Sequence, residues 1–304
     1  MSGKKRYLII VCGPTASGKT SLAIHLAQQY ATEILSSDSR QFFKEMNIGT
    51  AKPSAEELAV VKHHFINSLS IHTVYNAGDF EREGLKLLAQ LFLQHRVVIM
   101  AGGSGLYIKA ICEGLNSYPE VSPSIRRQLN LAFQHKGLAY LQEELLKLDP
   151  VYYKQVDTNN HRRMIRALEI CKGTGRAFSS FQTQNKTERD FEVIKLGIFW
   201  ERWQLYQGIN ERVDTMLSQG LEQEARTLYA YRRLNALQTV GYKEFFAYFD
   251  GVTSKEKAIE RIKRNSRRYA KRQMTWFNKQ GDIKWFKAPL DLSAVVDYLN
   301  ATIY

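Results

Sequence analysis

The stretch "GPTASGKT" at residues 13–20 follows the apolar run "YLIIVC" and decides the fold. It fits the pattern of a glycine, four residues, a second glycine, a lysine and a serine or threonine, which is typical of a phosphate-binding loop. Gly13 and Gly18 permit the tight turn that aims backbone N–H groups at an anion. Lys19 adds positive charge at the terminal phosphate, and the Thr20 hydroxyl is suited to ligate Mg²⁺. The alternative, a glycine turn beside a surface lysine, leaves the flanking strand and helix patterns unexplained.

The composition indicates a folded protein with a polyanionic partner. The chain has 304 residues, is 44% hydrophobic and carries a net charge of +13. Excess positive charge favours nucleic acid as the partner, and a membrane surface is the competing interpretation. No apolar stretch approaches the ~20 residues that a membrane span needs, and the N-terminal "MSGKKR" lacks a signal pattern. Cys12, Cys112 and Cys171 suit neither a disulfide framework nor a zinc site. We therefore expect a cytoplasmic protein with no membrane partner.

Strand and helix patterns alternate in the first part of the chain. Such alternation predicts a parallel, doubly wound α/β sheet of the P-loop NTPase type, with ligands at the carboxyl ends of the strands. The predicted strands are 6–12, 33–39, 96–105 and 193–200, and the predicted helices between them are 21–30, 54–65 and 80–95.

The sequence pattern changes near Tyr118, and this change predicts a second domain. "SYPEVSPSIRRQL" contains two prolines and opens a mostly helical region. We interpret residues 117–193 as a helical insertion domain within a core formed by 1–116 and 194–304. Two long helices are predicted to follow in the core, at 205–233 and 255–277.

The acidic residue that a P-loop ATPase carries at the end of its second apolar strand is missing. The strand "VVIMAGGSG" ends in Ala-Gly-Gly-Ser. Asp38 instead ends the strand that follows the first helix, where it faces the phosphate loop. Its carboxylate is suited to ligate a metal, act as a base or cap the next turn. The pattern counts against a nucleotide kinase or ATPase.

Several motifs together resemble the tRNA dimethylallyltransferase family, also called tRNA isopentenyltransferases. They are "GPTASGKT", "DSRQFFKEMNIGTAKP", "GGSGLY", "NNHRRMIRALEI", "INERVDTMLSQGL" and "QTVGYKEF", in the family's order from about residue 7 to 277. The resemblance implies transfer of a dimethylallyl group from its diphosphate to N6 of the adenosine 3′-adjacent to the anticodon, with Mg²⁺ required. The lack of a zinc-finger spacing after these motifs suits the bacterial type.

The resemblance also assigns roles to single residues. Asp38 is the expected general base and, with Thr20, the expected metal ligand. Ser104 stands where the family usually has threonine, near the same point; a turn-stabilising role is its alternative. The diphosphate-binding residues are expected to be Gly13, Pro14, Thr15, Ala16, Ser17, Gly18, Lys19, Thr20 and Arg212. The expected tRNA contacts are Asp38, Ser39, Arg40, Gln41, Ser104, Arg126, Arg162, Arg163, Met164, Ile165, Arg166, Val240, Gly241, Tyr242, Lys243, Glu244 and Phe245.

A basic segment at residues 255–272 supports an RNA partner. It holds nine Lys or Arg against Glu256 and Glu260, a net +7 that pairing along the helix cannot neutralise. The alternative interpretation is that these charges form a solvent-exposed helix face with no binding partner. This segment counts against the closest rival function, prenyl transfer to a free adenine nucleotide, which needs no large basic surface. The predicted partners are the tRNA anticodon stem-loop and dimethylallyl diphosphate, and the protein is expected to act as a monomer.

Overall fold

The computed structural model describes residues 5–182 and 187–304, and it forms two compact units. The larger unit combines Met1–Glu113 with Glu188–Tyr304, and the smaller is Gly114–Thr187. The smaller unit starts and ends slightly earlier than the predicted insertion at 117–193. Arg189 shows why, because it belongs to the core: its guanidinium donates to the Ile111 carbonyl and to Glu81, both at 2.8 Å. Residues 1–4, on which the predicted lack of a signal partly rests, lie outside the described residues.

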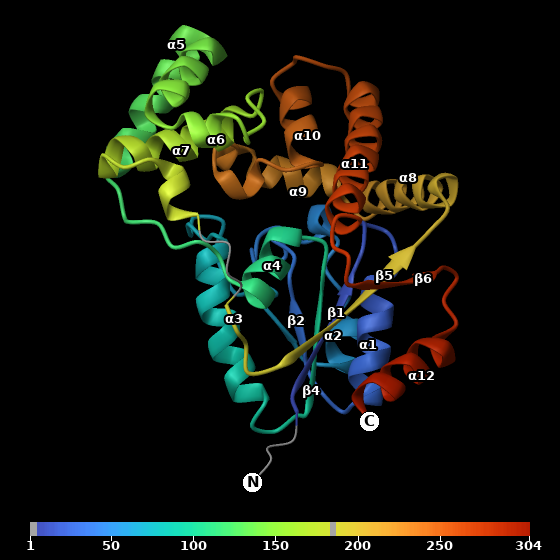
Figure 1. Ribbon diagram of the computed structural model, residues 1–304. Helices are drawn as coiled ribbons and strands as arrows, with labels where there is room; N and C mark the ends of the chain where they lie inside the picture. Colours follow the sequence, from blue (N-terminus) through green and yellow to red (C-terminus); the bar gives the residue numbers. More distant parts are fainter. Residues whose placement is uncertain (1–4, 183–186) are drawn as a thin grey trace. The chain divides into compact units, whose positions relative to one another are not determined.

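The larger unit is built on a six-stranded sheet with the order β3-β2-β4-β1-β5-β6. Every neighbouring pair is parallel, so the predicted doubly wound sheet is confirmed. β1 lies between β4 and β5 in the order, so the loop after it leaves from the interior of the sheet (Figure 1). The strands are β1 (Tyr7–Cys12), β2 (Ile34–Ser36), β3 (His63–His64), β4 (Val97–Gly102), β5 (Glu192–Phe199) and β6 (Ile283–Lys287).

Helices cover both faces of this sheet because its central strands are apolar on both sides. In β1, Ile9 and Val11 face one hydrophobic cluster, and Leu8 and Ile10 face the other. The first cluster contains side chains of α1 (Lys19–Gln29) and α12 (Leu292–Ile303). The second contains side chains of α3 (Ala77–Leu91) and α4 (Gly105–Glu113). Figure 1 shows α1 and α3 on opposite sides of the sheet.

The two edge strands were not predicted. The segment 54–65 was expected to be one helix, but α2 (Ala55–Val60) ends early, and His63 and His64 then pair with β2. β6 follows the predicted helix 255–277 and pairs with β5. Both strands are short and lack a clear period of two, so the pattern of the sequence does not reveal them.

A helical layer completes the larger unit beyond the carboxyl ends of the strands. The predicted continuous helix 205–233 is wrong, because Gly220 adopts φ = 101° and divides it. The layer consists of α8 (Arg202–Ser218), α9 (Leu221–Leu228), α10 (Tyr242–Phe249) and α11 (Lys255–Phe277). Its apolar side chains pack with Phe43, Met46 and Ile71 in a third cluster. The 3₁₀ helix η1 (Ile48–Thr50) closely follows Phe43 and Met46 in the chain.

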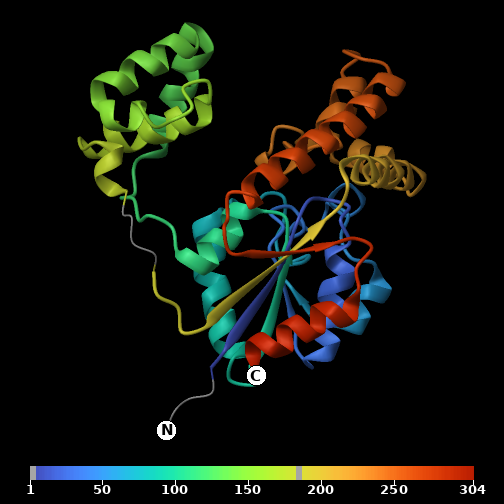
Figure 2. The same ribbon diagram turned by 45° about the vertical axis from the view of Figure 1, so that its right-hand side comes forward.

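The smaller unit is helical and has its own core. α5 (Pro123–Leu148) packs along α7 (His161–Thr174) (Figure 2). Gly137 interrupts α5 with φ = 73° and so kinks it. Between them, α6 (Pro150–Tyr153) is capped by the buried Asp149, which accepts a hydrogen bond from the Tyr152 N–H at 2.9 Å. No helix in the described part of the chain is long and apolar enough to cross a bilayer.

Two glycines give a matched test of this packing. A Cβ added at Gly102 would lie 2.2 Å from Ser37 Oγ and 2.6 Å from the Ser37 carbonyl carbon, whereas one added at Gly208 in α8 would meet no atom within 4 Å. We expect Gly102→Ala to lower the free energy of unfolding by about 1–3 kcal/mol through overpacking. Gly208→Ala should raise it by about 0.5–1 kcal/mol, because alanine favours the helix. Denaturant unfolding measures both, and equal effects would contradict this packing.

Candidate active site

The phosphate loop joins β1 to α1 and adopts the conformation that its glycines allow. Gly13 has φ = 147° and Gly18 has φ = 91°, values that side chains with a Cβ rarely adopt. Gly18 is the N-cap of α1 and provides no side chain to cap it. The first N–H groups of α1, at the positive end of the helix, are therefore available to a bound anion.

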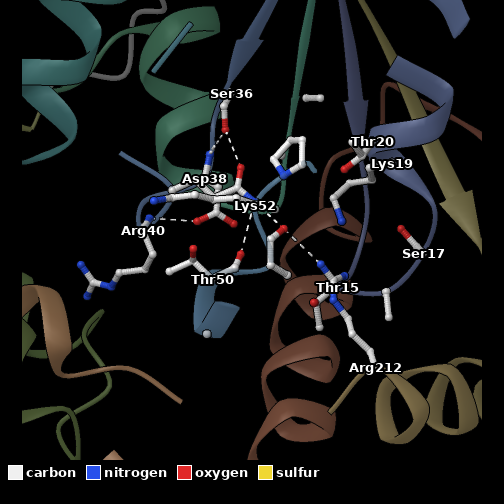
Figure 3. A pocket seen from close by; sticks show the side chains of 18 of the residues that line it. Thr15, Ser17, Lys19, Thr20, Ser36, Asp38, Arg40, Thr50, Lys52 and Arg212 are labelled. Carbon is white, nitrogen blue, oxygen red and sulfur yellow. Dashed lines mark hydrogen bonds between the residues drawn. The ribbon is translucent and has the colours of Figure 1, made fainter. Parts of the chain in front are cut away.

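The loop forms one wall of a cavity of about 380 Å³. Residues of β2 and the turn after it, of the end of β4, of the segments 49–53 and 239–241, and of helices α8 and α11 contribute to the other walls. The lining combines charged groups with apolar ones such as Ile209, Val213 and Met216. Figure 3 draws Asp38 and Arg40 on one side of the cavity, and Lys19, Thr20 and Arg212 on the other. The volume lies within the range of small-molecule sites.

Two cationic side chains, Lys19 and Arg212, line the same side of this cavity (Figure 3). Lys19 Nζ donates to the Pro14 carbonyl at 2.6 Å. Burial and, to a smaller extent, the neighbouring Arg212 lower the pKa of Lys19 to about 8, and the negative charge of Asp38 opposes the shift. Burial also lowers the pKa of Arg212, whose guanidinium donates to the Ala51 carbonyl at 3.3 Å. A bound anion would relieve the cost of holding these two charges together away from water.

Asp38 follows the carboxyl end of β2, as predicted, and its carboxylate caps a turn. Its Oδ1 accepts a hydrogen bond from the Arg40 N–H at 2.9 Å. The same charge lies close enough to Lys19 and Arg212 to oppose the lowering of the pKa of both by burial. Capping and a position in the cavity thus occur together at this residue.

Ser104 supports the turn that carries Asp38. Its Oγ accepts a hydrogen bond from the Ser39 N–H at 3.0 Å, and it is hydrogen-bonded to Tyr269 of α11. Burial, with a smaller contribution from Asp38, raises the pKa of the Tyr269 phenol. Tyr269 lines the cavity and was not identified in the sequence.

Several residues expected to contact tRNA make hydrogen bonds or apolar contacts within the protein. The Gln41 amide donates to the Thr50 and Ala51 carbonyls at 3.3 and 3.1 Å. Glu244 caps α10 by accepting from the Gly241 N–H at 2.9 Å. The side chains of Met164, Ile165, Tyr242 and Phe245 are buried in hydrophobic clusters. We therefore leave these four out of the proposed RNA surface.

Four arginines of the smaller unit were expected to contact tRNA. Arg162 and Arg163 are exposed near the start of α7. Arg126 and Arg166 lie beside the buried Glu169, at 3.8 and 3.0 Å. Arg126 is exposed as well, so Arg126, Arg162 and Arg163 are all accessible to a polyanion, although Arg126 and Arg166 also pair with a carboxylate of their own unit.

Gln273 of α11 is the main functional residue that sequence reasoning missed. Its Oε1 accepts a hydrogen bond from the Thr15 N–H of the phosphate loop at 2.9 Å, and its Nε2 donates to the Gly103 carbonyl at 3.0 Å. A signal was present, because Ser266, Tyr269 and Gln273 are spaced as one uncharged helix face, the first two within the basic segment 255–272 and Gln273 directly after it. Lys52 was also missed. It donates to Phe43, Asn47 and Asn67 and so closes the 43–52 segment.

The donor atoms of the cavity fit a magnesium ion bound together with a phosphate ligand. In residues 5–182 and 187–304, no group of three His, Cys, Asp or Glu side chains is placed to hold a metal. The Thr20 hydroxyl and the Asp38 carboxylate both line the cavity. Mg²⁺ prefers hard oxygen ligands and usually takes only one or two from the protein, with the remainder from phosphates and water.

Comparison with known proteins is consistent with this geometry. A family model described as IPP transferase matches residues 41–280. The chain is 54% identical to a tRNA dimethylallyltransferase of Christiangramia forsetii, over 98% of each protein, and 48% identical to one of Cytophaga hutchinsonii, over 100% of this chain and 99% of that protein.

Solved structures agree with the relatives in sequence. The full-length tRNA isopentenylpyrophosphate transferase of Bacillus halodurans superposes with a TM-score of 0.74 at 35% identity, covering 98% of this chain and 97% of that one. A eukaryotic dimethylallyltransferase acting on tRNA gives a TM-score of 0.79 at 28% identity, covering 95% of this chain and 75% of that one. By these matches along nearly its whole length, the chain belongs to the tRNA dimethylallyltransferase family of IPP transferases, as its motifs predicted.

Proposed function

We propose that this protein transfers the dimethylallyl group of dimethylallyl diphosphate to N6 of the adenosine 3′-adjacent to the anticodon of a tRNA. The products are the N6-dimethylallyl nucleoside and diphosphate. One observation carries the proposal: a single cavity combines a phosphate loop, the two partly buried cations Lys19 and Arg212, and the Asp38 carboxylate beyond the end of β2.

The donor diphosphate is proposed to bind at the loop. The N–H groups at the start of α1, Lys19 and Arg212 would neutralise the charge that grows as the bond from carbon to diphosphate breaks. Lys19 and Arg212 already lie within electrostatic reach of each other without a ligand. The apolar side chains of α8 along the same cavity offer a surface to the five-carbon chain.

Asp38 is proposed to take the proton from N6 as that nitrogen bonds to the allylic carbon. An exocyclic amine that is stacked in the anticodon loop cannot reach a carboxylate inside a cavity, so the base has to leave the stack. Unpaired loop nucleotides are suited to this, because they can be turned outward at little cost. Ser104 and Tyr269 support the turn on which Asp38 lies.

Thr20 and Asp38 are the residues that would hold Mg²⁺. When bound, the ion would neutralise part of the charge on the diphosphate leaving group. This assignment rests on the family's requirement and on the oxygen donors of the cavity.

The basic helix α11 is proposed to face the RNA backbone with one side only. Arg261, Arg264, Arg268 and Lys271 are exposed and follow a helical stripe. Arg267 is turned inward and donates to Asn210 at 2.6 Å. The opposite face contains Ile262, Ser266, Tyr269 and Gln273, which line the cavity. Phosphate contacts and donor binding would thus use two faces of one helix.

The rival functions are less well supported. β4 ends at Gly102 against Ser37 with no carboxylate, which disfavours an ATPase or a kinase. Prenyl transfer to a free adenine nucleotide would give the exposed basic stripe of α11 no binding partner. The tRNA substrate favours the cytoplasm as the place of action, and action as a monomer stays a prediction.

Replacement of the proposed base tests the function. Asp38→Asn keeps an oxygen for the Arg40 N–H but cannot take a proton, so the transfer rate should fall by about 10²–10⁴ while tRNA affinity changes little. The assay incubates labelled dimethylallyl diphosphate with total tRNA and identifies the modified nucleoside. A variant with a near-normal rate would remove Asp38 from this role. A wild-type protein that hydrolyses ATP in response to tRNA, and makes no prenylated adenosine, would refute the proposed function.

The pKa of Lys19 predicts how donor use depends on pH. Because this pKa lies at about 8, Lys19 is an ammonium below pH 8 and loses its charge as the pH rises through that value. The kcat/KM for dimethylallyl diphosphate should therefore fall by about tenfold per pH unit above pH 8, the limiting slope for loss of one essential proton. In Lys19→Arg the charge persists to higher pH, so this variant should be less active but without that fall. The same decline in both proteins would exclude Lys19 as its cause.

A further inference from the structure

Glu224, on α9, accepts four hydrogen bonds from outside its own helix. Its Oε2 accepts from the N–H groups of Asn47 and Ile48, at 2.8 and 2.9 Å. Its Oε1 accepts from the Gly49 N–H at 2.9 Å and from the Tyr242 hydroxyl at 2.7 Å. A single carboxylate therefore holds three consecutive backbone N–H groups at the start of η1.

The packing around Gly49 makes this arrangement specific. Tyr242 is fully buried, and a Cβ added at Gly49 would lie 2.6 Å from its ring. The segment 47–49 is thus held between the Glu224 carboxylate and the aromatic ring. This contact joins "GTAKP" and "VGY", two stretches that lie far apart in the sequence.

The segment that Glu224 anchors leads directly to the cavity. Two residues beyond Gly49, the Ala51 carbonyl accepts a hydrogen bond from Arg212 Nη2 at 3.3 Å and another from Gln41 Nε2 at 3.1 Å. The position of that carbonyl depends on the path of the backbone from η1. Arg212 is also the cation that acts on Lys19.

We propose that Glu224 is a positioning residue for the donor site. By fixing η1, it places the Ala51 carbonyl that orients the Arg212 guanidinium toward the diphosphate. The inference rests on the proposed function, because it assumes that the cavity binds a prenyl diphosphate. Glu224 itself does not line the cavity.

An amide cannot replace this carboxylate. All four of its partners are donors, and Glu224→Gln would turn an N–H₂ group toward at least one of them. Hydrogen bonds that involve a charged partner are stronger than neutral ones, and a buried donor that loses its acceptor is costly. The segment 47–51 should then relax and release Arg212.

Glu222 provides a matched control on the same helix. Its carboxylate pairs with Lys255 at 2.7 Å and with Arg226 at 3.1 Å. Neither partner lines the cavity. Glu222→Gln makes the same chemical change two residues away but should leave donor binding unchanged.

The experiment measures the Kd of dimethylallyl diphosphate by calorimetry in a double-mutant cycle. The proteins are wild type, Glu224→Gln, Arg212→Ala, the double variant and Glu222→Gln. In the wild-type background, Glu224→Gln should weaken binding by about 10- to 100-fold. In the Arg212→Ala background the same change should weaken it by less than about threefold, because the guanidinium that it positions is gone. A residue that only stabilises the fold would give equal losses in both backgrounds.

Equal losses, or a Glu224→Gln protein that binds as tightly as Glu222→Gln, would overturn the inference. If Glu224→Gln does not fold, Tyr242→Phe enters the cycle, since it removes one of the four donors and keeps the ring. Its loss of affinity should be about threefold and should also vanish without Arg212. Because the cycle reads binding alone, a wild type that binds the donor without prenylating tRNA would contradict the proposed function and not this inference.

Discussion

The two hydrogen bonds of the Gln273 side chain join the halves of the site. Thr15 of the phosphate loop and Gly103, beyond the end of β4, lie 88 residues apart in sequence and are bridged by one buried amide. A Cβ at Gly103 would lie 2.1 Å from Nε2, so the glycine is needed for this close approach. Since a buried amide has to satisfy both its donor and its acceptor, the loop cannot move away from the end of β4 without breaking at least one of these two bonds.

This bridge continues to the proposed base. Ser104 follows Gly103 and accepts from the Ser39 N–H, next to Asp38. Gln273 also belongs to α11, whose exposed stripe is proposed to meet the RNA backbone. A rigid helix that presents arginines outward and an amide inward gives a physical connection between the acceptor RNA and the donor loop. The Glu224 anchor acts on the opposite wall, through Ala51 and Arg212.

The sequence predicted those parts of the site that depend on local patterns. Short stretches of sequence are enough to predict the phosphate loop, the strand ending near Asp38 and the basic helix. Glycine spacing, apolar runs and charge bias are local properties of the sequence. The edge strands β3 and β6 were missed because they are short and are stabilised by partners far away in the chain. Gln273 and Glu224 were missed for the same reason, since their bonds span 258 and about 176 residues. The presence of a residue in a family motif also did not show whether its side chain lies on the surface, where RNA could contact it, or packs in the core. Tyr242 and Phe245 lie in a family motif, yet their side chains are buried in the core.

The central claim is that the phosphate loop holds a prenyl diphosphate while Gln273 keeps the loop fixed to the base-bearing side. A crystal structure with a non-hydrolysable analogue of dimethylallyl diphosphate and Mg²⁺ tests it most directly. The account predicts that the diphosphate lies against the N–H groups at the start of α1, within hydrogen-bond distance of Lys19 and Arg212, with both Gln273 bonds kept. A diphosphate bound away from the loop, or a loop that releases Gln273 to receive it, would contradict the account.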